Sequence, residues 1–210
     1  MLEELIKEYE RMQKIYGDKN LDSILFGGCS KNPDICFVFM NPTGKNIASS
    51  KEWKGIKSPW IGTKNIWKLF VQVDVISNKT YQEIEKKKPK DWTESFAKEV
   101  YQEIEKNKVF ITNLAKCTQK NARPLKDEIF KKYLKYFYKE MEIVKPKIII
   151  LLGNQVSSIV LNQSISVSTT RKQGFSYKGF TYYPVYYPVG NGIFNINKAI
   201  EDINYIKNNQ

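Results

Sequence analysis

The sequence predicts an α/β fold, a single three-layer α/β/α domain with a short, mostly parallel central sheet. Short runs of β-prone apolar residues recur along the chain, and segments with helical spacing lie between them. A continuous apolar run is typical of a strand buried on both faces, and alternation of such strands with helices is typical of a three-layer domain. With 210 residues, the chain is long enough to bury a substantial core in one domain.

Each expected element follows from its apolar spacing and from the glycines, prolines and asparagines that bound it. The charged middle segment contains Tyr-Gln-Glu-Ile-Glu-Lys twice, at 81–86 and 101–106, which indicates two similar solvated helical faces. The expected elements are a helix over 2–16, a strand over 35–40, a helix over 65–75, a charged helical segment over 79–107, a strand over 109–112, a helix over 125–144, a strand over 147–152, a helix beginning at 155, a strand over 180–187 and a closing helix over 198–207.

The charge balance indicates a polyanionic partner. The chain has 34 basic and 22 acidic residues, a net charge of +12. Codon bias is an alternative cause of the many lysines, but it does not account for the excess over acids. We therefore expect nucleic acid as the partner, ahead of an anionic membrane. No stretch approaches the roughly 20 apolar residues of a membrane helix, and the acidic N-terminal segment is unlike a signal peptide, so a cytoplasmic protein is expected, associated with the nucleoid if its partner is DNA.

The sequence excludes several kinds of chemistry. It contains no histidine, which removes Ser-His and Cys-His catalytic pairs. Its three cysteines, Cys29, Cys36 and Cys117, show no Cys-x-x-Cys spacing, so no zinc site is expected. Any catalysis must use amides, hydroxyls, backbone dipoles, carboxylates or lysines.

Asparagines stand at or just after the ends of three expected strands. Asn41 opens an Asn-Pro-Thr-Gly turn, Asn113 follows the second strand, and Asn191 lies in a glycine turn after the last. Ligands of open α/β sheets bind at the carboxyl ends of strands, and an amide offers both a donor and an acceptor to a base edge. With Trp60 as a flat apolar face, these residues indicate a pocket for a flipped nucleobase. For each residue, an ordinary turn or packing role is the structural alternative.

Several segments between about residues 24 and 207 resemble motifs of the uracil-DNA glycosylase superfamily, and they occur in the same order along the chain. Residues 109–117, Val-Phe-Ile-Thr-Asn-Leu-Ala-Lys-Cys, are similar to the iron–sulfur branch's Tyr-Ile-Thr-Asn-Val-Val-Lys-Cys. Residues 38–43 resemble the first motif, a Gly-x-x-Pro-Gly turn, with Asn before Pro as in the mismatch-specific and single-strand-selective branches. Residues 58–62 resemble the segment that carries the stacking Phe, and 184–189 resemble a last motif that normally reads Tyr-His-Pro-Ser. Arg123-Pro124 and residues 146–153 continue the match.

The resemblance implies a monofunctional DNA glycosylase of base excision repair, which flips a base out of the DNA and hydrolyses its N-glycosidic bond. Asn113 would read the base edge, Trp60 would stack on the base, and the backbone around Phe39 and Met40 would contact a carbonyl oxygen. Asn41 would hold the attacking water, and Tyr187, in place of the usual His, is the candidate donor to the departing base. The DNA contacts implied are Thr43, Lys45, Arg123, Arg171, Gly190, Asn191, Ile193 and Phe194.

Departures from the family pattern qualify this expectation. Of the iron–sulfur branch's four cysteines only Cys117 aligns, so we expect neither a cluster nor another cofactor. The missing His and the carboxamide at 41 predict modest activity. Ile193 and Phe194 either wedge into the base stack or belong to the core. The protein is expected to be a monomer that removes uracil or a related deaminated base. The alternatives are a nucleic-acid-binding member with little or no catalysis, and a glycosylase for hypoxanthine or a modified pyrimidine.

Overall fold

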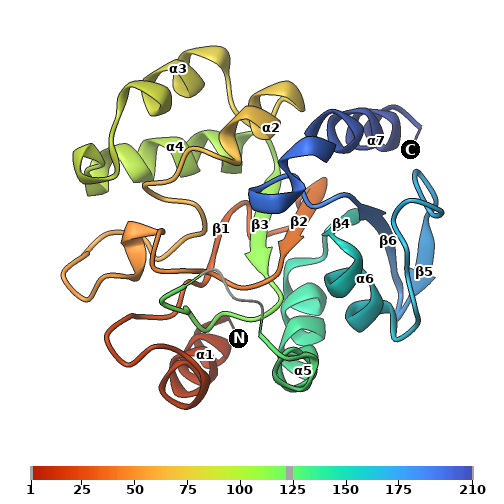
Figure 1. Cartoon of the computed structure of the whole chain (residues 1–210), viewed down its shortest axis with the longest axis horizontal. Coiled ribbons are helices and arrows are strands. Elements are labelled where there is room, and N and C mark those ends of the chain that lie inside the picture. Colours follow the sequence, from red (N-terminus) through yellow and green to blue (C-terminus); the bar gives the residue numbers. More distant parts are fainter. Residues whose placement is uncertain (1, 122–124, 210) are drawn as a thin grey trace.

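The computed structural model describes residues 2–121 and 125–209. In it, the chain folds into a mixed sheet that lies between two layers of helices (Figure 1). In that part of the chain the sheet has six strands in the order β1-β3-β2-β4-β6-β5. Its four central strands are parallel, and the edge strands are antiparallel to their neighbours. This arrangement confirms the predicted α/β fold. The strands are β1 (Phe26–Gly28), β2 (Ile35–Phe39), β3 (Val109–Asn113), β4 (Ile148–Leu152), β5 (Phe175–Tyr177) and β6 (Phe180–Val185).

The helices divide between the two faces of the sheet. One layer contains α1 (Leu2–Tyr16), α5 (Asp127–Val144) and α6 (Asn154–Leu161), and the other contains α2 (Trp67–Gln72), α3 (Asn78–Lys86), α4 (Glu94–Lys106) and α7 (Ile196–Asn208). None of the described helices is both long and apolar enough to cross a membrane.

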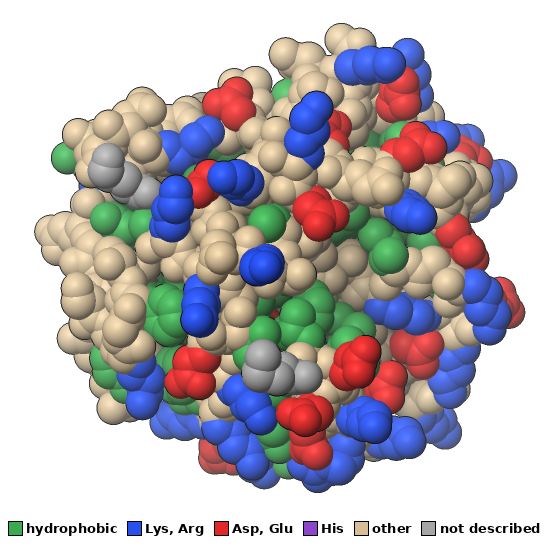
Figure 2. All heavy atoms as spheres, turned by 180° about the vertical axis from the view of Figure 1, so that it is seen from behind, with side chains coloured by type: hydrophobic (Ala, Val, Ile, Leu, Met, Phe, Trp, Pro, Cys, Tyr) green, Lys and Arg blue, Asp and Glu red, His purple; other side chains and the backbone are tan. Residues whose placement is uncertain are grey.

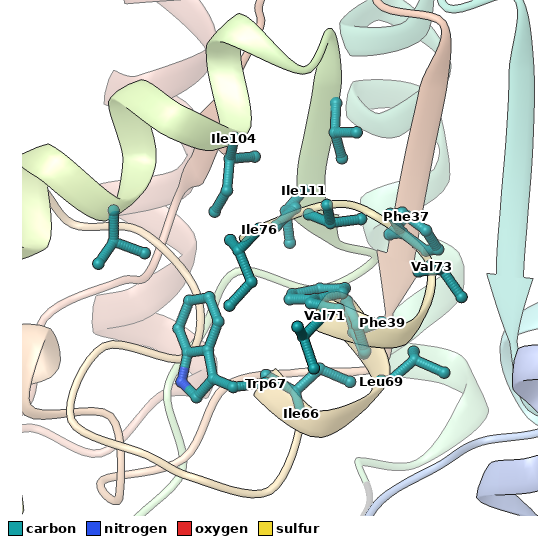
Figure 3. Close-up of a cluster of buried hydrophobic side chains, with 14 of the residues drawn as sticks. Phe37, Phe39, Ile66, Trp67, Leu69, Val71, Val73, Ile76, Ile104 and Ile111 are labelled. Carbon is teal, nitrogen blue, oxygen red and sulfur yellow. The ribbon is translucent and has the colours of Figure 1, made fainter. Parts of the chain in front are cut away.

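Alternating side chains of the central strands supply the two cores. Along β2, Phe37 and Phe39 join the core under α2, α4 and α7, whereas Cys36 and Val38 join the core under α1, α5 and α6. Figure 3 shows Phe37 and Phe39 against the α2 segment, which carries Trp67 and Leu69. Because all five residues of β2 are buried, the strand reads as one apolar run, which is why it could be predicted.

One sequence prediction is confirmed and another needs correction. The repeats at 81–86 and 101–106 form similar solvated faces, because each buries its isoleucine, Ile84 in α3 and Ile104 in α4, and leaves its Gln, its second Glu and its Lys exposed. The glycine turn after the last strand is a short 3-10 helix, η3 (Gly190–Asn195). Edge strands β1 and β5 were not predicted as strands, since each has only three residues and none of these is fully buried.

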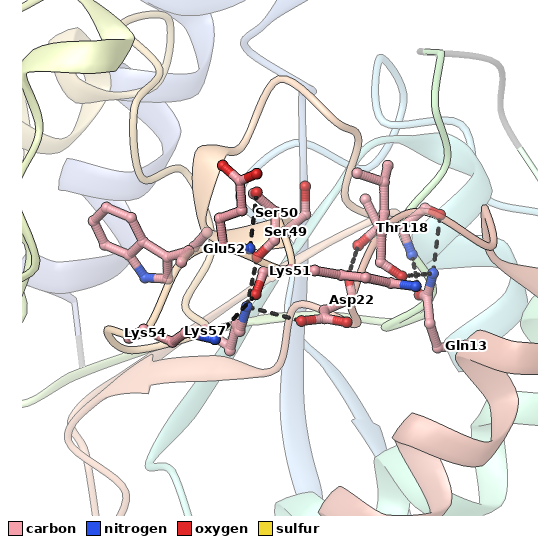
Figure 4. A network of polar contacts seen from close by, with 12 residues as sticks. Gln13, Asp22, Ser49, Ser50, Lys51, Glu52, Lys54, Lys57 and Thr118 are labelled. Atoms are coloured by element: carbon pink, nitrogen blue, oxygen red, sulfur yellow. Dashed lines mark hydrogen bonds and ion pairs between the residues drawn. The ribbon is translucent and has the colours of Figure 1, made fainter.

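The long loop between β2 and α2 is held by a polar network (Figure 4). The ammonium of Lys57 lies 3.0 Å from the Asp22 carboxylate and donates to the carbonyl of Ser50 at 2.9 Å. Gln13 of α1 accepts a hydrogen bond from the backbone of Thr118 at 2.7 Å, and the Thr118 hydroxyl donates to the Asp22 carbonyl at 2.7 Å. The network therefore joins this loop to α1 and to the segment that follows β3.

Candidate active site

The turns after β2 and β3 lie side by side at the carboxyl edge of the sheet. Phe39 is directly opposite Asn113 in the strand register. Beyond the strand ends, the N–H of Leu114 donates to the carbonyl of Phe39 at 2.7 Å, and the next N–H donates to the carbonyl of Met40 at 3.0 Å. These backbone bonds bring the turn that begins at Asn41 against the segment that follows Asn113, as the sequence predicted.

Asn113 combines burial with an unpaired amide. The residue is only 3% exposed, and its side chain makes no hydrogen bond to any residue that the structure describes. Neither atom of its amide is among the fully buried polar atoms that lack a partner in the described part of the chain. Its donor and acceptor are thus available to a ligand at this edge.

Asn41 is half-buried, and its side chain forms a hydrogen bond within its own turn. Its Nδ2 donates to the carbonyl of Pro42 at 3.2 Å, which agrees with the structural alternative of a turn-forming asparagine. Its Oδ1 accepts no hydrogen bond from the described residues. The side chain can orient a polar molecule, but a carboxamide takes up no proton at neutral pH.

Three aromatic rings lie next to these turns. The ring of Phe39 lies between the other two, 4.9 Å from the Trp60 ring and 6.5 Å from the Tyr187 ring, both edge-on. Phe39 itself is buried. Trp60 has a φ of 68°, an unusual backbone conformation for a bulky residue, and the N–H and hydroxyl of Thr63 both donate to its carbonyl. The buried indole N–H of Trp60 has no acceptor among the described residues.

Tyr187 follows β6 and approaches the backbone of two glycines. A Cβ on Gly153, whose φ is 98°, would lie 3.3 Å from the Tyr187 Cβ, and one on Gly192 would lie 2.0 Å from the Tyr187 carbonyl oxygen. Side chains at 153 and 192 would therefore displace Tyr187. Burial raises the pKa of Tyr187 to about 12, so its hydroxyl keeps its proton at neutral pH.

The helix η3 carries two exposed apolar side chains. Ile193 is 40% exposed and Phe194 is 91% exposed, which excludes the alternative that they belong to the core. Gly190 and Asn191 precede them and are also exposed. The close approach of Gly192 to the Tyr187 carbonyl oxygen places these side chains next to Tyr187.

The predicted DNA-contacting residues occupy different environments. Thr43 forms a backbone bridge with Gln119, and Lys45 is exposed in the same turn region. Arg171 is occupied by acidic partners, at 2.8 Å from the buried Asp202 and 2.9 Å from Glu201. Its guanidinium is therefore already paired with two carboxylates. Arg123 lies outside the described residues.

The sequence reasoning missed a buried ion pair beneath Asn113. Lys116 and Glu140 are both fully buried, and their side chains are 3.1 Å apart. Burial lowers the pKa of Lys116, and the neighbouring Glu140 carboxylate opposes that shift. The available signal was a single charged residue within the otherwise uncharged run 109–119.

The cysteines do not fit a four-cysteine cluster. Cys36 lies inside β2 against the sulfur of Met141, whereas Cys117 follows the carboxyl end of β3. The Cys29 N–H donates to the carbonyl of Val109, at the opposite end of the same strand. Among the described residues, no group of three or more His, Cys, Asp or Glu residues could hold a metal. That the protein lacks a cluster stays a prediction, which the iron content of the purified protein tests.

Two surface cavities lie elsewhere on the molecule. One, of about 310 Å³, is lined by residues of α1 and α5, and another, of about 380 Å³, lies beside the network of Figure 4. Asn41, Asn113, Trp60 and Tyr187 line neither of them.

Comparison with known proteins shows which family this chain is similar to. The family model described as the uracil DNA glycosylase superfamily matches residues 26–194. A type-4 uracil-DNA glycosylase from Sulfurisphaera tokodaii is 29% identical over 110 residues, which cover 47% of this chain and 49% of that protein. The chain thus spans about half the length of this curated relative. The residues matched by the family model include Asn41, Asn113, Trp60 and Tyr187.

Proposed function

Because this chain belongs to the uracil DNA glycosylase superfamily, we propose that it is a DNA glycosylase that removes uracil or a related deaminated base. The observation that carries the proposal is the amide of Asn113, nearly buried and unpaired among the described residues, beside the turn that carries Asn41. An amide offers an acceptor and donors that match the alternating carbonyl and N–H groups on the edge of uracil. The half-buried ring of Trp60, which packs edge-on against Phe39, supplies an apolar face on which a flat base can pack.

The reaction would be hydrolysis of the bond between base and sugar. As this bond breaks, negative charge develops on the base, and fixed donors around the base oxygens stabilise it. The Asn113 amide, the backbone around Met40 and the hydroxyl of Tyr187 are the donors proposed for this task. A water molecule oriented by Asn41 adds to the sugar carbon and releases a proton to solvent, and the departing base takes up a proton in turn.

The DNA would be held by the turn after β2 and by η3. Thr43 and Lys45 are proposed to contact phosphates, since they lie on the same turn as Asn41. Ile193 and Phe194 would enter the base stack when the target base flips out, with Gly190 and Asn191 alongside the backbone. A side chain that is 91% exposed can enter DNA without leaving the protein core.

The test is base release from oligonucleotides that contain uracil, in single and double strands. We expect release by the wild-type protein, and a loss of about 100-fold or more in the Asn113→Ala variant, the effect of removing one fixed donor. Asn78→Ala, which changes an exposed asparagine at the start of α3, is the matched control. No release by excess wild-type protein after long incubation would overturn the proposal for uracil.

Two alternatives are distinguished by the same assay. The self-bonded amide of Asn41 and the tyrosine at 187 favour a DNA-binding protein with little catalysis, which would bind DNA in a salt-sensitive way and release no base. Substrates with hypoxanthine or modified pyrimidines would reveal a glycosylase for another base.

A further inference from the structure

We propose that Lys116 is a positioning residue for the candidate site. Its side chain fixes the backbone of Asn113 through a hydrogen bond. The proposal rests on the proposed function, in which Asn113 reads the base. The Lys116 ammonium donates to the carbonyl of Asn113 at 2.6 Å. That carbonyl belongs to the residue whose amide is left for the base, so the contact fixes the point from which the side chain extends.

Lys116 is in turn fixed by a closed set of partners. Its ammonium also donates to the hydroxyl of Thr112 at 2.6 Å and to the carboxylate of Glu140 at 3.2 Å. The Thr112 hydroxyl donates to Glu140 at 2.6 Å, and the hydroxyl of Tyr9 donates to its other oxygen at 2.8 Å. The three donors of the ammonium therefore each have an acceptor, and a fully satisfied buried network is rigid.

The network links the site to a helix outside the family match. Tyr9 lies in α1, which precedes residues 26–194, and its ring lies 4.8 Å from the Lys116 ammonium. Glu140 lies in α5. Two helices of one layer thus hold a single backbone carbonyl at the end of β3.

A role in stability alone is the competing interpretation. A buried ion pair is weak support for a fold, because apolar residues of similar volume often stabilise as well or better. Replacing Lys116 and Glu140 together by methionine therefore removes the hydrogen bond to the Asn113 carbonyl while keeping the core filled. Removing one partner alone would leave an unpaired buried charge and confuse the two interpretations.

The test compares the double variant Lys116→Met/Glu140→Met with the wild type under single-turnover conditions. We expect a folded protein with an unchanged Kd for uracil-containing DNA and a release rate lower by about 10- to 100-fold, as for a misplaced reacting group. In an Asn113→Ala background the same double change should cost almost nothing further, because Lys116 acts through Asn113. A wild-type rate in the folded double variant, or an equal loss in both backgrounds, would overturn the inference.

A milder variant keeps the test decisive should the double variant not fold. Tyr9→Phe removes one hydrogen bond to Glu140, and Tyr138→Phe is the matched control, since its hydroxyl donates instead to the carbonyl of Val160. A smaller loss of rate in Tyr9→Phe alone supports the inference, and equal rates in the two variants contradict it. A wild-type protein without base release would instead refute the proposed function. In that case the side-chain amide resonances of Asn113 report on positioning: a shift in the double variant supports it, and none contradicts it.

Discussion

Asn41 is the residue where the chemistry of a single functional group matters most. An amide orients water without accepting its proton, whereas a carboxylate does both. We therefore predict that Asn41→Asp raises the rate of base release by about tenfold or more at neutral pH, within the range for added general-base catalysis. Single-turnover rates measure this, and the variant's rate should fall at acid pH as the new carboxyl becomes protonated. A rate at or below wild type would show that Asn41 does not face the water.

Tyr187 gives a second prediction at this scale, on pH. Its hydroxyl is protonated below its raised pKa of about 12, and the chain has no histidine to titrate near neutrality. The wild-type rate should therefore stay flat between about pH 6 and 9. Tyr187→Phe should lower the rate at least about tenfold at every pH in this range, since it removes a donor to the departing base. Equal rates for Tyr187→Phe and wild type would assign Tyr187 to packing alone.

Among the secondary structure elements, η3 offers the most direct test. Phe194 is so exposed that Phe194→Ala should leave the melting temperature unchanged. We predict a slower rate on double-stranded DNA and little change on single-stranded DNA, where no base pair has to be opened. Ile15→Ala, another exposed apolar side chain but on α1, is the control. Equal losses on both kinds of DNA would exclude a wedge.

The central strands could be predicted at the scale of elements, and the contacts between distant elements could not. β2 and β4 are continuous apolar runs and β3 begins with three apolar residues, so burial on both faces is visible in the sequence. Alignment of their ends follows from parallel pairing, which is why Asn41 and Asn113 could be expected at one edge. The bond between Lys116 and Glu140 joins residues 24 positions apart, and no local period reports such a pair. Likewise, apolar character alone could not decide whether Phe194 is core or surface.

At the scale of the whole molecule, the net charge of +12 does not by itself describe a DNA-binding face. Figure 2 shows the molecule from behind, with Lys and Arg side chains interspersed with Asp and Glu. Several basic groups are also neutralised locally, among them Arg171 by Asp202 and Lys147 by Asp34 at 2.7 Å. Net charge is therefore a poor guide to how many phosphates the protein contacts, and the salt dependence of binding measures that number directly.

The last prediction is about that salt dependence. The logarithm of the DNA affinity should fall linearly with the logarithm of salt concentration, by about 0.9 per phosphate neutralised on double-stranded DNA. Lys45 lies on the turn at the carboxyl edge of the sheet, so Lys45→Ala should reduce the slope by about one. Lys178 is also exposed, but it precedes β6 at the opposite edge, so Lys178→Ala should leave the slope unchanged. Titrations of fluorescent DNA at several salt concentrations give all three slopes. A slope reduced by Lys178→Ala and not by Lys45→Ala would mean that DNA binds away from Asn41 and Asn113, because released counterions report only the lysines that touch the DNA.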